Sequence, residues 1–213
     1  MKPLAQCRLY TFIDTAFLRG RDPAKLAREL CRGGSDLIQL RAKSLAPGEI
    51  RRLAEAILPT LREAGVGLVV NDHYDIAREV GADYCHLGQE DFFGAGFTRV
   101  AELAAGPSAP AIGISTHSPD EARRALAAEP AYIAIGPVYA TATKPGVKPV
   151  AVEYVGWAAS HVRIPWFAIG GINLGNVDQV VAAGAAGICA ISAILDAPDA
   201  AEACREFKRR LPL

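Results

Sequence analysis

The chain has 213 residues, of which 51% are hydrophobic, and its 23 Lys and Arg residues are balanced by 23 Asp and Glu residues. A chain of this length can bury one large core, so we expect a single domain over residues 1–213. The even charge argues against an extensive nucleic-acid or membrane-surface patch. It leaves room for a local site that binds a small anion.

Signals for membranes, secretion and thiol chemistry are weak in this sequence. The segment MKPLAQCR at residues 1–8 has no apolar signal region. The uncharged run over 180–195 is shorter than the roughly 20 residues that a membrane helix needs. The five cysteines are scattered without a CxxC or a Cys/His ligand spacing. We therefore expect a cytoplasmic protein without a zinc or redox centre.

Short apolar runs rich in β-forming residues alternate along the chain with segments of helical spacing. The runs cover residues 8–14, 36–41, 67–72, 84–88, 111–116, 132–138, 165–171 and 187–192. Helix starts are marked by Asp22 before Pro23, and by a Ser-x-x-Glu capping box from Ser118 to Glu121. Eight such strand–helix units predict an α/β fold, a compact (β/α)8 TIM barrel.

The alternative fold is an open doubly wound sheet. That fold usually carries a GxGxxG loop after its first strand, and the segment DTAFLRGRD at residues 14–22 has none. The barrel prediction is weakest at the third unit, where residues 73–83 must hold a whole helix. In a barrel, ligand chemistry lies at the C-terminal ends of the strands, so the polar residues that end each run are the candidates for a site.

The second run ends in QLRAK, residues 39–43. Side chains alternate across a strand, which places Gln39, Arg41 and Lys43 on one face and Leu40 and Ala42 on the other. Two cations at a barrel mouth would bind an anion, because Arg grips phosphate oxygens with paired N–H groups and Lys adds a compact charge. The alternative is that both side chains simply reach into water.

The third run ends in Asn71-Asp72, and the fourth is followed by Glu90-Asp91. Carboxylates on neighbouring strand ends, here Asp72 and Asp91, suit Mg²⁺, which keeps waters and completes its shell with substrate phosphate. The alternative for Asp72 is a cap on the helix that begins near His73. Glu90 is interpreted as a solvated rim residue.

The fifth run ends in Ser115, and His117 follows it in the loop. His117 is a candidate general acid or base, with an ordinary loop histidine as the alternative. The loop after the sixth run carries Thr141, Thr143 and Lys144, which could close over an anion or form a polar surface loop.

The seventh run ends in Gly170-Gly171, and the eighth ends in Ile191-Ser192. Glycine lets a phosphate approach backbone N–H groups, and loops 7 and 8 are the frequent phosphate site of this fold. A mouth with two separate anion sites, one of them at Arg41 and Lys43, would suit an enzyme that joins two phosphorylated small molecules.

Seven segments in this order resemble the thiamine phosphate synthase family. They are QLRAK, VVND, HLGQED, GISTHS, GPVYATATK, AIGGI and AISAI, and they fall between Leu9 and Ile194. The resemblance implies a (β/α)8 barrel and a Mg²⁺-dependent transferase that couples hydroxymethylpyrimidine diphosphate to hydroxyethylthiazole phosphate. The products would be thiamine phosphate and pyrophosphate, formed by dissociative substitution without a nucleophilic side chain. A homodimer is also implied.

The resemblance further implies roles for individual residues. The pyrimidine diphosphate set is Gln39, Leu40, Arg41, Ala42, Lys43, Asn71, Ser115 and Lys144. The thiazole phosphate set is Thr141, Ala142, Thr143, Gly171, Ile191 and Ser192. Asp72 and Asp91 would hold one Mg²⁺ per subunit. The catalytic group would be Arg41, Lys43, Ser115 and Lys144.

One segment departs from the family pattern, and two other functions share the fold. PGVKPVAVEYV at residues 145–155 does not match the family spacing, which leaves the closure of that loop open. A thiazole tautomerase of the same superfamily also has a histidine in the loop of His117, but such proteins tend to lack the metal acids. A non-catalytic barrel that senses a phosphorylated ligand would have lost leaving-group residues. The intact Asp72 and Asp91 favour the synthase.

Overall fold

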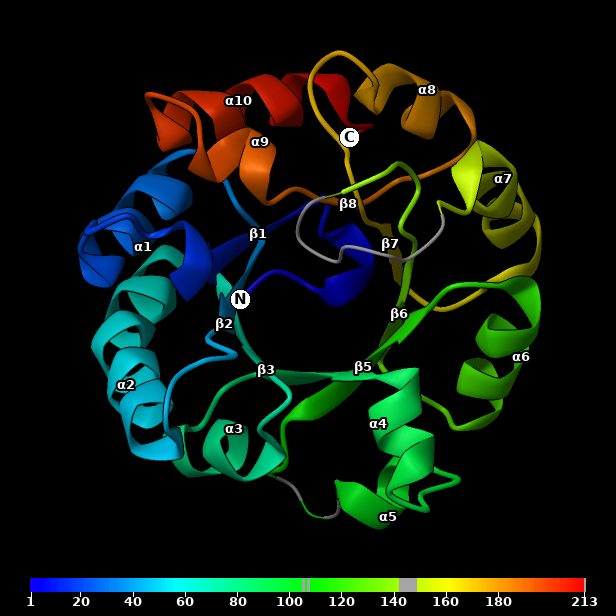
Figure 1. Ribbon diagram of the computed structural model, residues 1–213, viewed down its shortest axis with the longest axis horizontal. Helices are drawn as coiled ribbons and strands as arrows, with labels where there is room; N and C mark the ends of the chain where they lie inside the picture. The colour runs from blue at the N-terminus through cyan, green and yellow to red at the C-terminus, as the bar shows by residue number, and fades with distance from the viewer. Residues whose placement is uncertain (105, 107, 142–148, 213) are drawn as a thin grey trace.

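The computed structural model describes residues 1–104, 106, 108–141 and 149–212. Within this part of the chain, eight parallel strands pair in sequence order, and β1 pairs with both β2 and β8 to close a barrel (Figure 1). The strands are β1 (Leu9–Asp14), β2 (Leu37–Arg41), β3 (Gly67–Asn71), β4 (Tyr84–Gly88), β5 (Ala111–Thr116), β6 (Tyr132–Ile135), β7 (Trp166–Ala168) and β8 (Ile188–Cys189).

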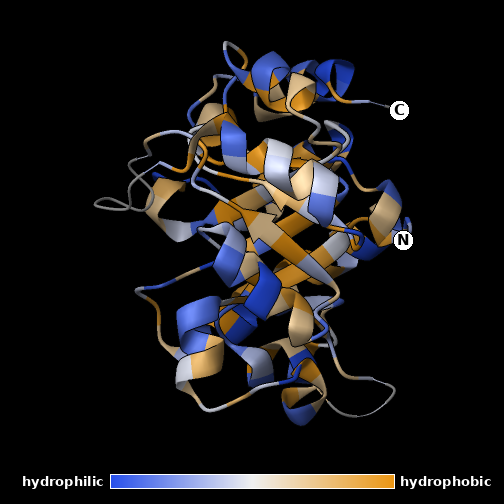
Figure 2. Cartoon of the chain, turned by 90° about the vertical axis from the view of Figure 1, so that its right-hand side faces the viewer, coloured by the Kyte–Doolittle hydropathy of each residue, from blue (hydrophilic) through white to orange (hydrophobic). Residues whose placement is uncertain are grey.

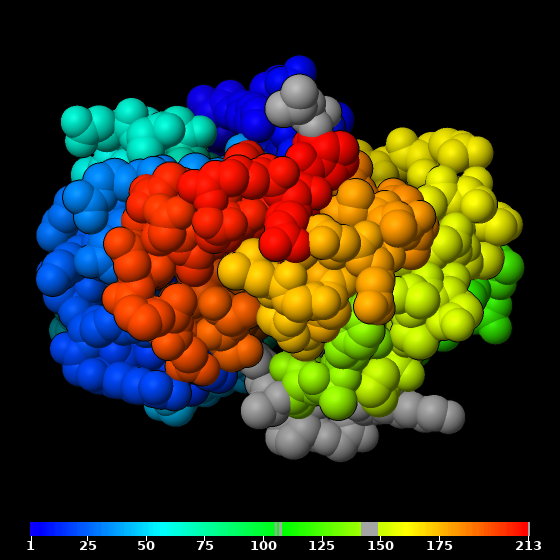
Figure 3. Space-filling view, turned by 90° about the horizontal axis from the view of Figure 1, so that it is seen from above, coloured from blue at the N-terminus to red at the C-terminus, as the bar shows by residue number. Residues whose placement is uncertain are grey.

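Helices surround the barrel and cover its outer face (Figure 1). Figure 3 shows α10 on this surface between α1 and α8, two helices that it contacts. The helices are η1 (Leu4–Gln6), η2 (Thr15–Phe17), α1 (Pro23–Arg32), α2 (Pro47–Ala64), α3 (Tyr74–Val80), α4 (Gln89–Gly94), α5 (Val100–Leu103), α6 (Pro119–Ala127), α7 (Ala151–His161), α8 (Val177–Ala182), α9 (Ser192–Leu195) and α10 (Ala200–Arg210).

The closed barrel confirms the fold prediction, and the open doubly wound sheet is wrong. The third unit is short but complete, because α3 has 7 residues and ends at Gly81, whose φ is +69°. A left-handed residue of this kind stops a helix within one position. Residues 73–83, the stretch that made the barrel prediction weakest, therefore hold a helix and the two turns that join it to β3 and β4.

The seventh and eighth strands end earlier than their apolar runs predict. β7 stops at Ala168, because Gly170 and Gly171 take φ values of +101° and +65° and turn the chain out of the sheet. β8 stops at Cys189, and Ile191 has a ψ of −86° that no strand continues. The residues beyond both strands form loops at the mouth of the barrel.

The start of α6 is capped differently from the predicted capping box. The Ser118 hydroxyl accepts the Glu121 N–H at 3.2 Å, as predicted. The Glu121 carboxylate, however, accepts the N–H of His117 at 2.7 Å instead of that of Ser118. The cap is therefore confirmed, and its second hydrogen bond is used to hold the loop that carries His117.

The core has two layers, which the alternation of side chains along each strand separates. Leu9, Ile13, Ile38 and Leu40 point outward and pack against the helices. The strand residues between them point into the barrel, where Tyr10, Phe12, Tyr84, Tyr132 and Phe167 form an aromatic cluster. Figure 2 shows the hydrophobic strands running through the centre of the molecule.

The aromatic cluster fills the barrel interior, so the fold is a packed core with one hollow end. Tyr10 and Tyr132 both meet Phe167 edge to face, with ring centroids 5.4 and 5.6 Å apart. Gly113 makes room for this packing, because a Cβ there would lie 2.0 Å from Cζ of Tyr132. Of this cluster, Tyr10 and Phe12 line the hollow at the mouth, whereas Tyr84, Tyr132 and Phe167 are not among its lining residues.

Candidate active site

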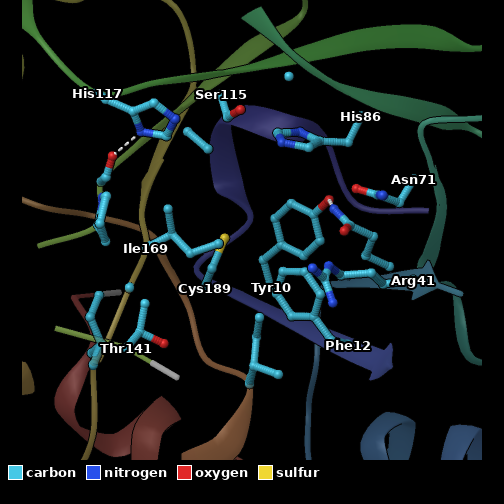
Figure 4. Close-up of a pocket in the computed structure, with 18 of the residues that line it drawn as sticks. Tyr10, Phe12, Arg41, Asn71, His86, Ser115, His117, Thr141, Ile169 and Cys189 are labelled. Carbon is cyan, nitrogen blue, oxygen red and sulfur yellow. Dashed lines mark hydrogen bonds between the residues drawn. The ribbon is translucent and has the colours of Figure 1, made fainter. Parts of the chain in front are cut away.

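The C-terminal ends of the strands converge on a pocket of about 260 Å³ at the barrel mouth (Figure 4). Eleven of the residues singled out from the sequence line it. They are Gln39, Arg41, Lys43, Asn71, Asp72, Asp91, Ser115, Thr141, Gly171, Ile191 and Ser192. Glu90 and His117 line it as well. The structure thus brings together residues from β2, β3, β5 and the loops after β4, β6, β7 and β8.

Five other candidates do not add a described side chain to the pocket. Leu40 and Ala42 are 0% and 5% exposed and pack in the outer core, as their alternation with Arg41 requires. Only their backbone remains for a ligand. Ala142, Thr143 and Lys144 lie outside the described residues.

The pocket-facing side chains of β2 and of the loop after it become more exposed from Gln39 to Lys43. Gln39 is only 3% exposed, whereas the side chain of Arg41 is 17% exposed and that of Lys43 is 55% exposed. A neutral amide therefore lies at the floor, and two cations lie above it toward the rim. This order suits a ligand with an uncharged ring at one end and an anionic group at the other.

Arg41 is held in place by a residue that sequence reasoning missed. Its Nη1 donates to Oδ2 of Asp14 at 2.7 Å, and Oδ1 of Asp14 accepts the N–H of Ala16 at 3.0 Å. Asp14 ends β1 opposite Arg41 in the parallel register, and it is 1% exposed. The register of β1 against β2 is the signal that could have found it.

Asp72 has an unusual backbone at the end of β3. Its φ is +65°, its N–H donates to the His86 carbonyl at 2.9 Å, and the next N–H, that of His73, donates back to the Asn71 carbonyl at 2.9 Å. This three-residue turn with positive φ is rare for a residue other than glycine, and such strain clusters at functional sites.

The turn also settles the alternative role considered for Asp72. The residue that caps α3 is His73, and no side chain caps that helix within the described structure. The Asp72 carboxylate instead lies 3.5 Å from Nζ of Lys43 and lines the pocket. The helix-cap interpretation of Asp72 is therefore wrong, while Asp75 does lie in the first turn of α3.

Glu90 and Asp91 lie in the first turn of α4, whose N-cap residue is Gly88. A Cβ at Gly88 would meet Oδ2 of Asp91 at 2.7 Å and would lie 3.7 Å from Oε2 of Glu90. The absence of a side chain at Gly88 is thus what lets the Asp91 carboxylate turn over the strand end toward the pocket. Glu90 is exposed, as predicted, and lines the pocket rim beside it.

The described charges around the pocket have an acidic surplus. The cations Arg41 and Lys43 face the carboxylates Asp72, Glu90 and Asp91, and the Arg41 charge is already paired with Asp14. No cluster of three His, Cys, Asp or Glu side chains with metal-binding geometry occurs among the described residues. Two hard carboxylates without a full protein cage match Mg²⁺, which takes its remaining ligands from water and phosphate.

The loops after β5 and β6 are joined through His117. Its Nδ1 is hydrogen-bonded to the carbonyl oxygen of Gly136, and because a carbonyl only accepts, Nδ1 carries the proton (Figure 4). Gly136 and Pro137 are joined by a cis peptide bond. His117 therefore has a structural partner in the loop after β6 as well as a place in the pocket wall.

The loops after β6 and β7 pack closely against each other. A Cβ on Gly170 would lie 2.4 Å from Cα of Pro137, and one on Gly171 would lie 2.7 Å from the Ala140 carbonyl oxygen. Both glycines also have positive φ, so a side chain at either position would meet both a steric clash and an unfavourable backbone conformation. A second hollow adjoins this contact and is lined by Thr141, Gly171, Asn173, Ser192 and Asp196, among others.

Besides Gln39, the pocket is lined by residues that were not predicted from the sequence, among them Tyr10, Phe12, His86, Ile169 and Cys189. Burial raises the pKa of the Cys189 thiol well above 9.0, so the thiol stays protonated. A protonated thiol is a poor nucleophile, so the pocket offers no activated cysteine. The alternation of Tyr84, His86 and Gly88 along β4 is the pattern that could have placed His86 inside the barrel.

The fold and the site define a class: a TIM-barrel protein whose mouth combines cations, a pair of carboxylates and a glycine-lined loop pair. The model of the family described as "Thiamine monophosphate synthase" matches residues 9–194. The chain belongs to this family, whose members are Mg²⁺-dependent transferases of thiamine biosynthesis that act on phosphorylated thiamine precursors.

Relatives and solved structures agree with this assignment. The chain is 44% identical to the thiamine-phosphate synthase of Thermus thermophilus over 180 residues, which cover 84% of each chain. It is 41% identical to that of Acidothermus cellulolyticus over 98% of this chain and 96% of the relative. The thiamine phosphate pyrophosphorylase structure from Pyrococcus furiosus superposes with a TM-score of 0.82 at 26% identity, covering 98% of this chain and 97% of the other. In the part of the chain that the structure describes, no helix is long and apolar enough to cross a membrane.

Proposed function

We propose that this chain couples hydroxymethylpyrimidine diphosphate to hydroxyethylthiazole phosphate at the barrel mouth, with Mg²⁺ held by Asp72 and Asp91. Thiamine phosphate synthase activity follows from the family and from relatives about 40% identical over most of the chain. The observation that carries the site assignment is the division of one pocket into two halves. A half with cations and carboxylates lies at β2 to β4, and a glycine-lined half lies at the loops after β6, β7 and β8.

The pyrimidine diphosphate is assigned to the first half. The buried amide of Gln39 would face the uncharged ring, while Arg41 and Lys43 above it would face the diphosphate. Asn71 is 9% exposed at the end of β3, and Ser115 lies on β5 across the pocket. Both can donate hydrogen bonds to a ligand between them. The depth gradient along β2 supports this orientation.

Asp72 and Asp91 are assigned to one Mg²⁺ per subunit. When bound, the ion would offset the acidic surplus among the described residues of the mouth and stabilise negative charge on the diphosphate as it leaves. Without a divalent cation, the carboxylates Asp72, Glu90 and Asp91 would repel an incoming diphosphate. The surplus of carboxylates among the described pocket residues therefore supports a metal requirement that is coupled to substrate binding.

The thiazole phosphate is assigned to the second half of the pocket, beside Thr141, Gly171, Ile191 and Ser192. Backbone N–H groups of a glycine turn can approach phosphate oxygens closely, and hydroxyls at its edges add donors. Ala142, Thr143 and Lys144 belong to the same assignment through the family resemblance, and they lie outside the described residues.

The reaction we propose is a dissociative substitution. The bond between the pyrimidine methylene carbon and the diphosphate oxygen breaks, and its electron pair leaves with pyrophosphate. The thiazole ring nitrogen then donates its electron pair to that carbon and forms the new C–N bond. No side chain has to act as a nucleophile, which agrees with the protonated Cys189 at the floor. Arg41 and Lys43 stabilise the charge on the leaving group, and the pocket holds the thiazole in line.

A coupling assay tests this proposal. Purified protein is mixed with both substrates in Mg²⁺ or in EDTA, and thiamine phosphate is measured as its fluorescent oxidation product. The proposal predicts product in Mg²⁺ and none in EDTA. Binding of both substrates without product would instead indicate a ligand-sensing barrel. Failure to bind the diphosphate would indicate a tautomerase, and His117 would become the residue to replace. A homodimer remains a prediction that size-exclusion chromatography with light scattering would check.

A further inference from the structure

A chain of hydrogen bonds crosses the barrel interior beneath the pocket. Nε2 of Gln39 donates to the Tyr10 hydroxyl at 2.6 Å, and the Tyr10 hydroxyl lies 3.0 Å from that of Tyr132. The Tyr132 hydroxyl lies 3.1 Å from Nδ1 of His86. The four residues come from β2, β1, β6 and β4, so these hydrogen bonds connect opposite sides of the barrel.

Three of these residues reach the pocket, and one does not. Gln39, Tyr10 and His86 line the pocket floor, where Figure 4 shows Tyr10 and His86. Tyr132 is 0% exposed and lies below the lining residues. Its hydroxyl is the link between Tyr10 and His86. Gly113, which lies opposite Tyr132 on β5, leaves room for the Tyr132 ring, because a Cβ there would overlap it.

The number of available protons restricts which group donates and which accepts in each of these hydrogen bonds. Each phenol has one proton to donate, and burial raises the pKa of Tyr10 and Tyr132 well above 10, so both keep it. When Gln39 donates to Tyr10, Tyr10 must donate to Tyr132, and Tyr132 must donate to Nδ1 of His86. Otherwise the Tyr10 proton would be buried without an acceptor, which is costly.

The opposite direction is complete only if the Gln39 amide turns around. Its oxygen would then accept from Tyr10, Tyr10 would accept from Tyr132, and His86 would need its proton on Nδ1. The orientation of the Gln39 amide and the position of the His86 proton are therefore coupled through Tyr10 and Tyr132. In the structure the amide nitrogen faces Tyr10, which leaves the amide oxygen for a ligand.

We propose that Tyr132 is a positioning residue, whose hydroxyl fixes through Tyr10 the orientation in which the Gln39 amide meets the ring of the pyrimidine substrate. A pyrimidine edge presents donors and acceptors in a fixed order, so an amide locked one way is complementary to one edge only. The inference rests on the proposed function, because that function supplies the ligand at Gln39. It assigns a recognition role to a side chain that does not touch the ligand.

The Tyr132→Phe variant tests this role, because it removes one oxygen and keeps the ring. Tyr84→Phe is the matched control. Tyr84 belongs to the same aromatic cluster, its ring centroid is 6.0 Å from that of Tyr132, and its hydroxyl makes no hydrogen bond within the described structure. Calorimetry would measure binding of two ligands to each variant: the pyrimidine diphosphate, and inorganic pyrophosphate with Mg²⁺, which uses only the charged half of the site.

The expected result is a selective loss. Tyr132→Phe weakens binding of the pyrimidine diphosphate by roughly 5- to 10-fold, the scale of one misplaced hydrogen bond, while pyrophosphate binding stays within about twofold. In turnover the loss falls mainly on KM. Tyr84→Phe behaves as wild type. Equal losses for both ligands, equal losses in both variants, or no loss in Tyr132→Phe would overturn the positioning role.

A double-mutant cycle separates action through Gln39 from a direct effect. In a Gln39→Ala background, Tyr132→Phe should add less than about a twofold loss, and a fully additive loss would overturn the inference. If Tyr132→Phe fails to fold, Tyr10→Phe removes the acceptor for Gln39 and should give the same selective loss. A wild-type protein that neither binds the pyrimidine diphosphate nor forms product would overturn the proposed function and this inference together. An active wild type with an unaltered Tyr132→Phe overturns this inference alone.

Discussion

The Arg41 guanidinium is bound to the buried Asp14 carboxylate at 2.7 Å, across the register of the first two strands. Asp14 is almost fully buried, whereas Arg41 is partly exposed to the pocket. Because Arg has five N–H donors in a rigid plane, one bond to Asp14 sets the direction in which the others point. Asp14 thus orients the cation that is assigned to the leaving diphosphate.

Asp14→Asn tests this orienting role. Asn keeps an oxygen for the Ala16 N–H but removes the charge that holds Arg41. We expect kcat/KM for coupling to fall about 10- to 100-fold, because a small misplacement of a catalytic group has effects of this size. Asp120→Asn, at an exposed ion pair on α6, is the control. Wild-type kinetics in Asp14→Asn would show that Arg41 does not depend on it.

Arg41→Ala should have a larger effect than Asp14→Asn, because it removes the cation itself. We expect turnover to fall roughly 10²- to 10³-fold, the scale of losing one preorganised electrostatic group. Arg52→Ala on the exposed face of α2 should leave the rate unchanged. Near-normal turnover in Arg41→Ala, measured at saturating substrate, would contradict its assignment to the leaving group.

Gly88→Ala should weaken the metal site without harming the barrel. Gly88 has a φ of −65°, which alanine adopts readily, but the new Cβ would press on the Asp91 carboxylate. We expect a higher Mg²⁺ concentration for half-maximal coupling, with the maximal rate recovered at high Mg²⁺. Gly48→Ala, where nothing lies within 4 Å of the added carbon, is the control. An unaltered Mg²⁺ requirement would indicate that Asp91 does not contact the ion.

Asp36 provides a test of stability at the opposite end of the strands. Burial tends to raise its pKa, but hydrogen bonds from Lys208 and from the N–H groups of Leu9 and Arg8 outweigh burial and lower the pKa below 3.8. A lowered pKa in the folded state stabilises the protein above the unfolded-state value, and this contribution is lost as pH falls through the folded-state pKa.

We therefore expect Asp36→Asn to cost about 2 kcal/mol in unfolding free energy at pH 7, the scale of a charged hydrogen-bond group. The difference from wild type should shrink as the pH is lowered below 3.8. Urea unfolding of both proteins at pH 7 and in acid would measure it, with Asp120→Asn as the exposed control. A difference that persists or grows in acid would contradict the ionised role of Asp36.

The sequence predicted those features of the site that depend on local alternation. Gln39, Arg41 and Lys43 line the pocket because period-two alternation is a property of any strand, and Leu40 lies outward for the same reason. Asp72 and Asp91 reach the same mouth because parallel strands end at one face of a barrel.

The missed features depend on contacts between different strands or loops and on backbone conformation. Predicting the Asp14–Arg41 pair would require the register of β1 against β2. Predicting the series of hydrogen bonds from Gln39 to His86 would require the closed barrel. The early end of β7 depends on positive φ at Gly170 and Gly171 and on the packing of Gly171 against Ala140, and that of β8 depends on the ψ of Ile191. None of these can be inferred from the apolar runs alone.

Whether Asp72 and Asp91 hold a catalytic Mg²⁺ is tested by the dependence of the coupling rate on Mg²⁺ in wild type, Asp72→Asn, Asp91→Asn and Asp75→Asn. We expect EDTA to abolish coupling by wild type. We also expect Asp72→Asn and Asp91→Asn each to raise the Mg²⁺ requirement at least about 10-fold, since even changes to residues that only support a metal ligand typically cost this much. Asp75→Asn, in the first turn of α3, should match wild type. Coupling that survives EDTA, or an unchanged Mg²⁺ requirement in both Asp72→Asn and Asp91→Asn, would contradict a Mg²⁺ site at these two carboxylates.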